Sequence, residues 1–199
     1  FLKEIEKNDY NILTGNLKYH SQDPYFELYL NNSKRALNRY KTKQTIPYYY
    51  LLFSNACIKK SILTKNIFNS SFTSYGGSEM EFSYRLNNNN KILFIPNIIC
   101  TRFNHPSLRD HILKLEEFGK KNIYFLFQNI NTNDLPTIYK FFKLFFNKIS
   151  IYLFPFLLFF RWILFNILTI SPIFLSLKII KYILGLSVLI GISKNYNLK

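Results

Sequence analysis

Cysteine is scarce in this sequence, and the cysteines present match no metal site. Cys57 and Cys100 are the only two among 199 residues, and their separation fits none of the paired spacings by which cysteines bind zinc. We expect both side chains to be buried as small apolar groups. The scarcity also favours a reducing compartment over one that forms disulfides.

Acidic residues are absent from the C-terminal part of the chain. All eleven lie at or before Asp134, against 26 lysines and arginines and a net charge of +15. From residue 140 onward the charged side chains are Lys140, Lys143, Lys148, Arg161, Lys178, Lys181, Lys194 and Lys199. A hydrophobic segment carrying only positive charge favours an anionic membrane surface as partner. Nucleic acid is disfavoured, because its binders usually interleave aromatic and basic residues on a polar face.

Two long apolar runs, residues 149–170 and 172–193, occupy this basic segment. Each is long enough to cross a bilayer as a helix. Against crossing, Arg161 lies in the first run and costs about 2.5–3.5 kcal/mol on insertion scales, while Lys178 and Lys181 share one helical face, as in an interfacial helix. Residues 140–199 are therefore predicted to be membrane-associating helices, and spanning, flat and re-entrant arrangements all remain open.

Residues 75–86 combine two glycines, two carboxylates and the start of a helix. Gly76 and Gly77 allow positive φ angles and close approach of a ligand, and Ser78 with Glu81 forms a capping-box pattern. Glu79 would lie in the first turn, where the helix dipole stabilises a carboxylate. That position suits a catalytic base, but an ordinary capped surface helix would carry an acid there too.

Two side chains that flank these carboxylates are further candidates. Tyr75 has a ring that can stack on a sugar and a hydroxyl that can bind it. Arg85 can pair with Glu81 four residues earlier, or it can face a phosphate.

The flanking segments place further candidates around this loop. Residues 47–53 read as a buried strand, and Asn55 follows in a turn, as a ligand contact or as an Asx-turn that only shapes the backbone. Residues 91–95 and 98–103 read as two strands, and the second brings His105 to a strand end, a usual place for active-site groups.

Two helix starts are also predicted. Asp23-Pro24 has the N-cap and first-turn residues of a helix, and Ser107 with Asp110 forms a second cap pattern. Glu116 and Glu117 are expected at the solvated end of the helix that begins after Ser107.

In this order the motifs resemble the C-terminal half of family 2 glycosyltransferases over residues 12–127. That family has an Asn in a small-residue turn, a Gly-Gly-Glu-Asp-x-Glu loop and helix, a Lys-Ile-x-Phe-x-Pro strand and a closing His. Here Asn55, Lys91-Ile92-Leu93-Phe94-Ile95-Pro96 and His105 occupy the corresponding places. The resemblance implies an α/β chain in which residues 1–139 are the C-terminal, acceptor-side part of a GT-A fold, followed by the hydrophobic helical tail.

The resemblance also implies an activity and roles for named residues. A sugar would pass from a nucleotide-sugar to a hydroxyl of a glycan or lipid-linked acceptor, with inversion, at the cytoplasmic face of the cell membrane. Glu79 would be the catalytic base, and His105 would help bind a divalent metal, Mg or Mn, so we expect the two to face a shared cleft. The substrate-binding residues would be Asn55, Tyr75, Gly76, Gly77, Glu81 and Arg85.

Two departures from the family pattern bear on activity. The chain has no Asp-x-Asp motif, so we expect most metal ligands to lie upstream of Phe1 and the fragment to be inactive alone. Ser78-Glu79 stands where the family has Glu-Asp. The longer side chain displaces the carboxylate by about 1 Å, which can cost about 100-fold in rate. The alternative is therefore a catalytically inactive module that docks on a membrane.

Overall fold

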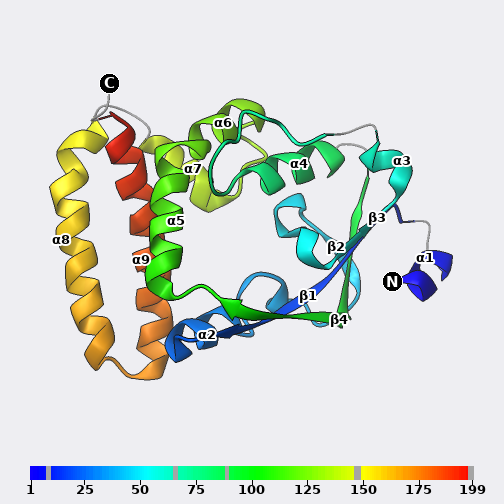
Figure 1. Cartoon of the computed structure of the whole chain (residues 1–199), viewed down its shortest axis with the longest axis horizontal. Helices are drawn as coiled ribbons and strands as arrows, with labels where there is room; N and C mark the ends of the chain where they lie inside the picture. Colours follow the sequence, from blue (N-terminus) through cyan, green and yellow to red (C-terminus); the bar gives the residue numbers. More distant parts are fainter. Residues whose placement is uncertain (8–9, 65–66, 88–89, 146–148, 197–199) are drawn as a thin grey trace. The chain divides into compact units, whose positions relative to one another are not determined.

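The computed structural model describes most of the chain, namely residues 1–7, 10–64, 67–87, 90–145 and 149–196. It is a mixed α/β structure that divides into two compact units (Figure 1). The first unit comprises residues 1–22, 27–69 and 79–105. The second comprises residues 23–26, 70–78 and 106–199.

The first unit is built on a four-stranded mixed sheet in the order β2-β4-β1-β3. Its strands are β1 (Ile12–Ser21), β2 (Gln44–Ile46), β3 (Ala56–Ile58) and β4 (Ile92–His105). The two central strands, β1 and β4, run parallel, and each edge strand is antiparallel to its neighbour. Leu13, Leu93 and Ile95 form a buried cluster on this sheet.

The helices before β4 are short. They are α1 (Leu2–Lys7), α2 (Pro24–Leu30), α3 (Lys60–Leu63) and α4 (Ser78–Asn87), with 3-10 turns at Ala36–Arg39, Tyr48–Tyr50 and Phe53–Asn55. The predicted start of α2 is confirmed, because the Asp23 side chain accepts a hydrogen bond from the backbone N–H of Phe26 at 3.1 Å.

The predicted strand over residues 47–53 is wrong, because this segment forms two 3-10 turns. Successive side chains of a strand point to opposite faces. Here the consecutive rings contact each other instead, with centroids 5.3 Å apart for Tyr48 and Tyr49 and 4.6 Å apart for Tyr49 and Tyr50. Pro47, at the start of the segment, also has no N–H to donate to a strand partner.

The two strands predicted on either side of Pro96 are one continuous strand, β4. The parallel register pairs Thr14 with Phe94 and then Asn16 with Ile99. The β4 residues between Phe94 and Ile99 therefore form a bulge, and this bulge contains Pro96. Gly15 faces this bulge, and a Cβ there would lie 2.2 Å from the carbonyl oxygen of Ile98. A glycine opposite the bulge therefore lets a proline stay within the sheet.

Five helices make up most of the second unit. They are α5 (Leu108–Lys120), α6 (Asn122–Asn129), α7 (Thr137–Leu144), α8 (Ile149–Ile170) and α9 (Ile173–Tyr196). The predicted cap of α5 is confirmed: the Ser107 hydroxyl oxygen accepts a hydrogen bond from the backbone N–H of Asp110 at 3.2 Å. In Figure 1, α9 lies between α5 and α8, and it packs against both.

Within the described residues, two segments are long and apolar enough to cross a membrane: Tyr152–Ile170 of α8 and Leu175–Asn195 of α9. None of the first segment is buried, against 61% of the second. Both predicted apolar helices are therefore present at the expected places. The sequence places a boundary at residue 140 between a transferase part and a membrane-associating part, and that boundary stays a prediction. In the structure, residues 106–199 all belong to the second unit.

Candidate functional site

The glycine loop has the backbone geometry that the sequence predicts. Gly76 and Gly77 have φ angles of 81° and 88°, which residues with a Cβ rarely adopt. A Cβ on Gly76 would lie 3.1 Å from the Phe118 ring, and one on Gly77 would lie 3.0 Å from Phe72. The space that a Cβ would occupy at these two glycines is therefore filled by the rings of Phe118 and Phe72 and not left open for a ligand.

Asn122, at the start of α6, holds this loop in place. Its amide nitrogen donates to the carbonyl oxygens of Ser74 at 2.7 Å and Gly76 at 2.8 Å, and the side chain is fully buried. These bonds tie the glycine loop to α6 within the second unit. Sequence reasoning missed Asn122, because an asparagine before an apolar run resembles any helix cap.

Tyr75 is an exposed ring beside a cation. It is 42% exposed, and the Lys114 ammonium lies 5.6 Å from its ring centroid. His111 approaches the same ring edge to face at 6.5 Å. Its exposure leaves Tyr75 able to stack on a sugar, and that role stays a prediction.

The two carboxylates at the start of α4 have opposite environments. Glu81 is 2% exposed, and its oxygens accept hydrogen bonds from Arg85 Nε at 2.6 Å and from a terminal Arg85 nitrogen at 3.2 Å. Instead of reaching back to Ser78 in a capping box, Glu81 forms the predicted pair with Arg85. Glu79 is exposed, and within the described part of the chain no hydrogen bond or ion pair engages its carboxylate.

Arg85 is also held by its surroundings. The guanidinium donates to the carbonyl oxygen of Ile67 at 2.6 Å and lies 5.1 Å from the centroid of the Phe82 ring. Together with the pairing to Glu81, these contacts orient Arg85 along α4. To bind a phosphate instead, Arg85 would have to give up contacts with Glu81, Ile67 and Phe82.

Asn55 links two strands of the sheet by hydrogen bonds. Its amide nitrogen donates to the carbonyl oxygens of Asn16 at 2.7 Å and Ile98 at 3.1 Å, which ties β1 to the irregular part of β4. Both amide hydrogens are used in these bonds, and the residue is buried. Only its side-chain oxygen has capacity left for a ligand, so a sugar contact stays a prediction.

His105 ends β4 in a buried position. It is 8% exposed, and its ring meets that of Tyr19 edge to face at 5.0 Å. Glu79 is exposed whereas His105 is buried, and the open cleft predicted to be shared by the two stays a prediction. Among the residues that the structure describes, no group of three or more His, Cys, Asp or Glu side chains could hold a metal ion.

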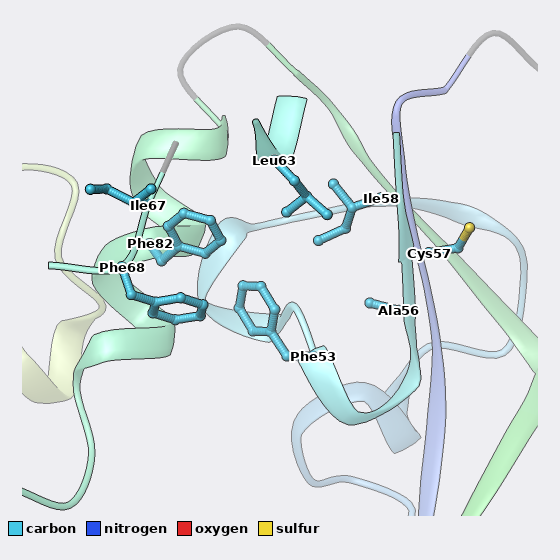
Figure 2. Close-up of a pocket in the computed structure, with 8 residues that line it drawn as sticks. All are labelled: Phe53, Ala56, Cys57, Ile58, Leu63, Ile67, Phe68 and Phe82. Atoms are coloured by element: carbon cyan, nitrogen blue, oxygen red, sulfur yellow. The ribbon is translucent and has the colours of Figure 1, made fainter. Parts of the chain in front are cut away.

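An apolar hollow of about 650 Å³ lies beside α4 in the first unit. In Figure 2, the rings of Phe53, Phe68 and Phe82 face Ile58 and Leu63 across it, and the Cys57 sulfur points away. Phe68 and Phe82 stack with centroids 4.3 Å apart. The hollow suits an apolar group, because the described residues that line it include no charged or hydroxyl side chain.

The two cysteines differ in exposure. Cys57 is half-buried and Cys100 is exposed, so the predicted burial of Cys100 is wrong.

Glu116 is a charged group that sequence reasoning misplaced. It was predicted at a solvated helix end, but it is 7% exposed and pairs with Arg161 of α8 and Lys194 of α9. Burial raises the pKa of Glu116, but the hydrogen bonds from both cations outweigh it and hold that pKa below its ordinary value of 4.5. The signal in the sequence was Arg161, because a cation in an apolar helix needs a counter-charge.

Comparisons of the chain with protein-family models, with characterised proteins and with solved structures find no match. The fold and the candidate site therefore define a mixed α/β protein with two apolar C-terminal helices, and its function is argued from its own residues.

Proposed function

We propose that this chain is the acceptor-side part of an inverting glycosyltransferase of the GT-A type that works at the cytoplasmic face of a membrane. It would transfer a sugar from a nucleotide-sugar to a hydroxyl of a glycan or lipid-linked acceptor. The parallel pair β1 and β4, with α4 preceding β4 in the chain, is compatible with the C-terminal half of that fold. The two apolar helices support the membrane location.

The observation that carries the proposal is the contrast between the two carboxylates of α4. Glu81 is committed to Arg85, whereas Glu79 is exposed and unengaged by the described residues. A base must reach a substrate that arrives from solvent, and of these two carboxylates only Glu79 is accessible.

In the proposed reaction, Glu79 accepts the proton of the acceptor hydroxyl. As the proton leaves, the acceptor oxygen bonds to the anomeric carbon of the donor sugar, and the bond from that carbon to the nucleoside diphosphate breaks. Attack opposite the leaving group inverts the configuration. A positioned base contributes about 10²–10⁴-fold to such a step.

The resemblance to family 2 glycosyltransferases implies a divalent metal, which would neutralise the diphosphate leaving group. His105 is the candidate ligand in this chain, and its burial against Tyr19 does not fit a metal site. The proposed chemistry therefore depends on Glu79 alone.

The test is Glu79→Gln in the full-length protein, assayed as release of nucleoside diphosphate from nucleotide-sugars in the presence of membrane acceptors. We expect kcat to fall by about 10²–10⁴-fold with unchanged circular dichroism, because the exposed carboxylate supports no other described contact. Glu6→Gln is the matched control, since Glu6 is an exposed acid on α1. Equal turnover in the Glu79 variant and the wild type would remove Glu79 from the role of base.

A second candidate function is a catalytically inactive module that docks on a membrane. The buried His105 and the exposed apolar surface of α8 favour it. This candidate predicts no sugar transfer by the wild-type full-length protein with any nucleotide-sugar, together with undiminished membrane binding by Glu79→Gln.

A further inference from the structure

Helix α8 carries an exposed apolar face along its described length. Most of the large side chains on this face are three, four or seven residues apart, which places them on one side of a helix. They are Tyr152, Phe156, Phe159, Phe160, Ile167 and Ile170, and the neighbouring Trp162 is 63% exposed. A contiguous face of this size marks a surface that meets another apolar phase.

Helix α9 is equally apolar, but it is a core helix of the second unit. Residues 187–193 are all buried, and two successive turns without an exposed residue mean that every side is covered. Gly119 of α5 and Gly191 of α9 bring the two backbones together: a Cβ on Gly191 would lie 2.2 Å from the carbonyl oxygen of Glu116. Lipid chains therefore have no access to these two turns of α9.

Helix α5, which packs against α9, is too highly charged to enter the hydrocarbon of a bilayer together with α9. Helix α5 has exposed Arg109 and Asp110 in its first turn and a surface ion pair between Glu117 and Lys121 near its end. Each charged side chain placed at the bilayer centre costs about 2.5–3.5 kcal/mol on insertion scales. Because α5 and α9 are in backbone contact, a membrane-spanning α9 would carry these charges into the bilayer.

Arg161 does not oppose contact between α8 and lipid, because its charge is turned inward. The guanidinium pairs with the buried carboxylate of Glu116, and the Arg161 side chain is 18% exposed. The one cation of α8 is thus neutralised on the side away from the apolar face. Arg161 is the only charged residue within α8.

We propose that α8 lies in the plane of an anionic bilayer, with its exposed face inserted at the boundary between headgroups and acyl chains. Helix α9 does not cross the bilayer; it backs α8 as part of the protein core. Interfacial helices of this kind insert about 5–10 Å. Anionic lipid is the favoured partner because Lys140, Lys178 and Lys181 are exposed and no acid follows Asp134.

This inference rests on the membrane association in the proposed function and not on sugar transfer. Vesicle binding needs no donor, acceptor or metal, so a failure here is separate from a failure of the Glu79 test. The arrangement selects the flat alternative among the three that the sequence leaves open.

The chain's one tryptophan, Trp162, provides the measurement. Purified chain is mixed with vesicles of equal parts phosphatidylglycerol and phosphatidylcholine, brominated either near the headgroups or near the acyl-chain ends. We expect a blue shift of Trp162 emission and stronger quenching by the shallow bromines. In a spanning α8, Trp162 would lie within about 4 Å of the bilayer centre, so stronger quenching by the deep bromines would overturn the proposal.

Matched variants separate lipid binding from other uses of the face. Phe156→Ser removes an exposed ring of α8 and should weaken vesicle partitioning about tenfold. Phe103→Ser removes an exposed ring of β4 and should leave partitioning unchanged. An unshifted Trp162 spectrum with vesicles would overturn the proposal. A dimer that Phe156→Ser abolishes, with no vesicle binding, would overturn it too and would assign the face to contact between copies of the chain.

Discussion

At the scale of single residues, Glu116 connects three helices through one carboxylate. Its two oxygens accept hydrogen bonds from Arg161 and from Lys194, so α5, α8 and α9 share a buried charge cluster. Removing the shared partner leaves two cations without their acceptor, which costs more than a typical surface ion pair is worth.

We predict that Glu116→Gln lowers the free energy of unfolding of the second unit by about 2–3 kcal/mol. The partial exposure of Lys194 keeps the loss below that of a fully buried pair. Urea unfolding followed by circular dichroism measures it. Glu117→Gln is the control, because Glu117 pairs with Lys121 at the surface, and its loss should stay within about 0.5 kcal/mol.

The lowered pKa of Glu116 also predicts a pH dependence. Because the folded state binds the proton less tightly than the unfolded state, the stabilisation is present above the ordinary pKa of 4.5 and is lost as the pH falls below it. The difference in stability between wild type and Glu116→Gln should therefore shrink on acidification below pH 4.5. A constant difference down to pH 3 would contradict this role for the carboxylate.

At the scale of secondary-structure elements, α5 and α9 meet through glycines. A Cβ on Gly119 would lie 2.2 Å from the carbonyl oxygen of Val188, and one on Gly191 would meet the backbone of α5 equally closely. The helices must separate to admit a methyl group at either position. Gly185 of α9 has no neighbouring atom within 4 Å of such a Cβ.

We expect Gly191→Ala to destabilise the second unit by about 1–3 kcal/mol, the usual cost of overpacking. Gly185→Ala should be neutral or stabilise by up to about 1 kcal/mol, because alanine is the better helix former. Thermal unfolding monitored at a helical band compares the two. Equal effects of both substitutions would mean that α5 and α9 are not in backbone contact.

Sequence reasoning located elements where local chemistry decides them. The caps at Asp23 and Ser107 and the two apolar C-terminal helices were predicted correctly, because each depends on neighbouring residues or on a long run of one composition. The strand over residues 47–53 was wrong: the segment forms 3-10 turns in which consecutive tyrosine rings contact each other, and an unbroken apolar run has no periodicity that would distinguish such turns from a strand. The continuity of β4 past Pro96 depends on Gly15, far away in the sequence.

The candidate site was predictable only in part for the same reason. The Glu81–Arg85 pair and the positive φ angles at Gly76 and Gly77 follow from local spacing. The use of Asn55 to bridge β1 and β4 follows from tertiary packing, as does the burial of Glu116. Local pattern could not distinguish these polar side chains from ones that serve a ligand.

At the scale of the whole molecule, the distribution of charge is the dominant feature. A net charge of +15 attracts anionic surfaces in general, but the exposed lysines of α9 lie in the same unit as the apolar face of α8. Each lysine held near an anionic surface contributes about 1 kcal/mol, and the contribution fades within a Debye length. The described residues of the first unit contain no long apolar helix beside their lysines, so position as well as number should determine binding.

Replacing Lys178 and Lys181 together by glutamine should therefore reduce partitioning into phosphatidylglycerol vesicles about 30-fold at low salt, the effect of about 2 kcal/mol. Partitioning into pure phosphatidylcholine should be unchanged, because no lipid charge is present to attract the lysines. The matched control replaces Lys59 and Lys60, two exposed lysines of the first unit. Co-sedimentation measures both variants, and equal losses would show that net charge alone drives binding, with no preferred membrane-facing side.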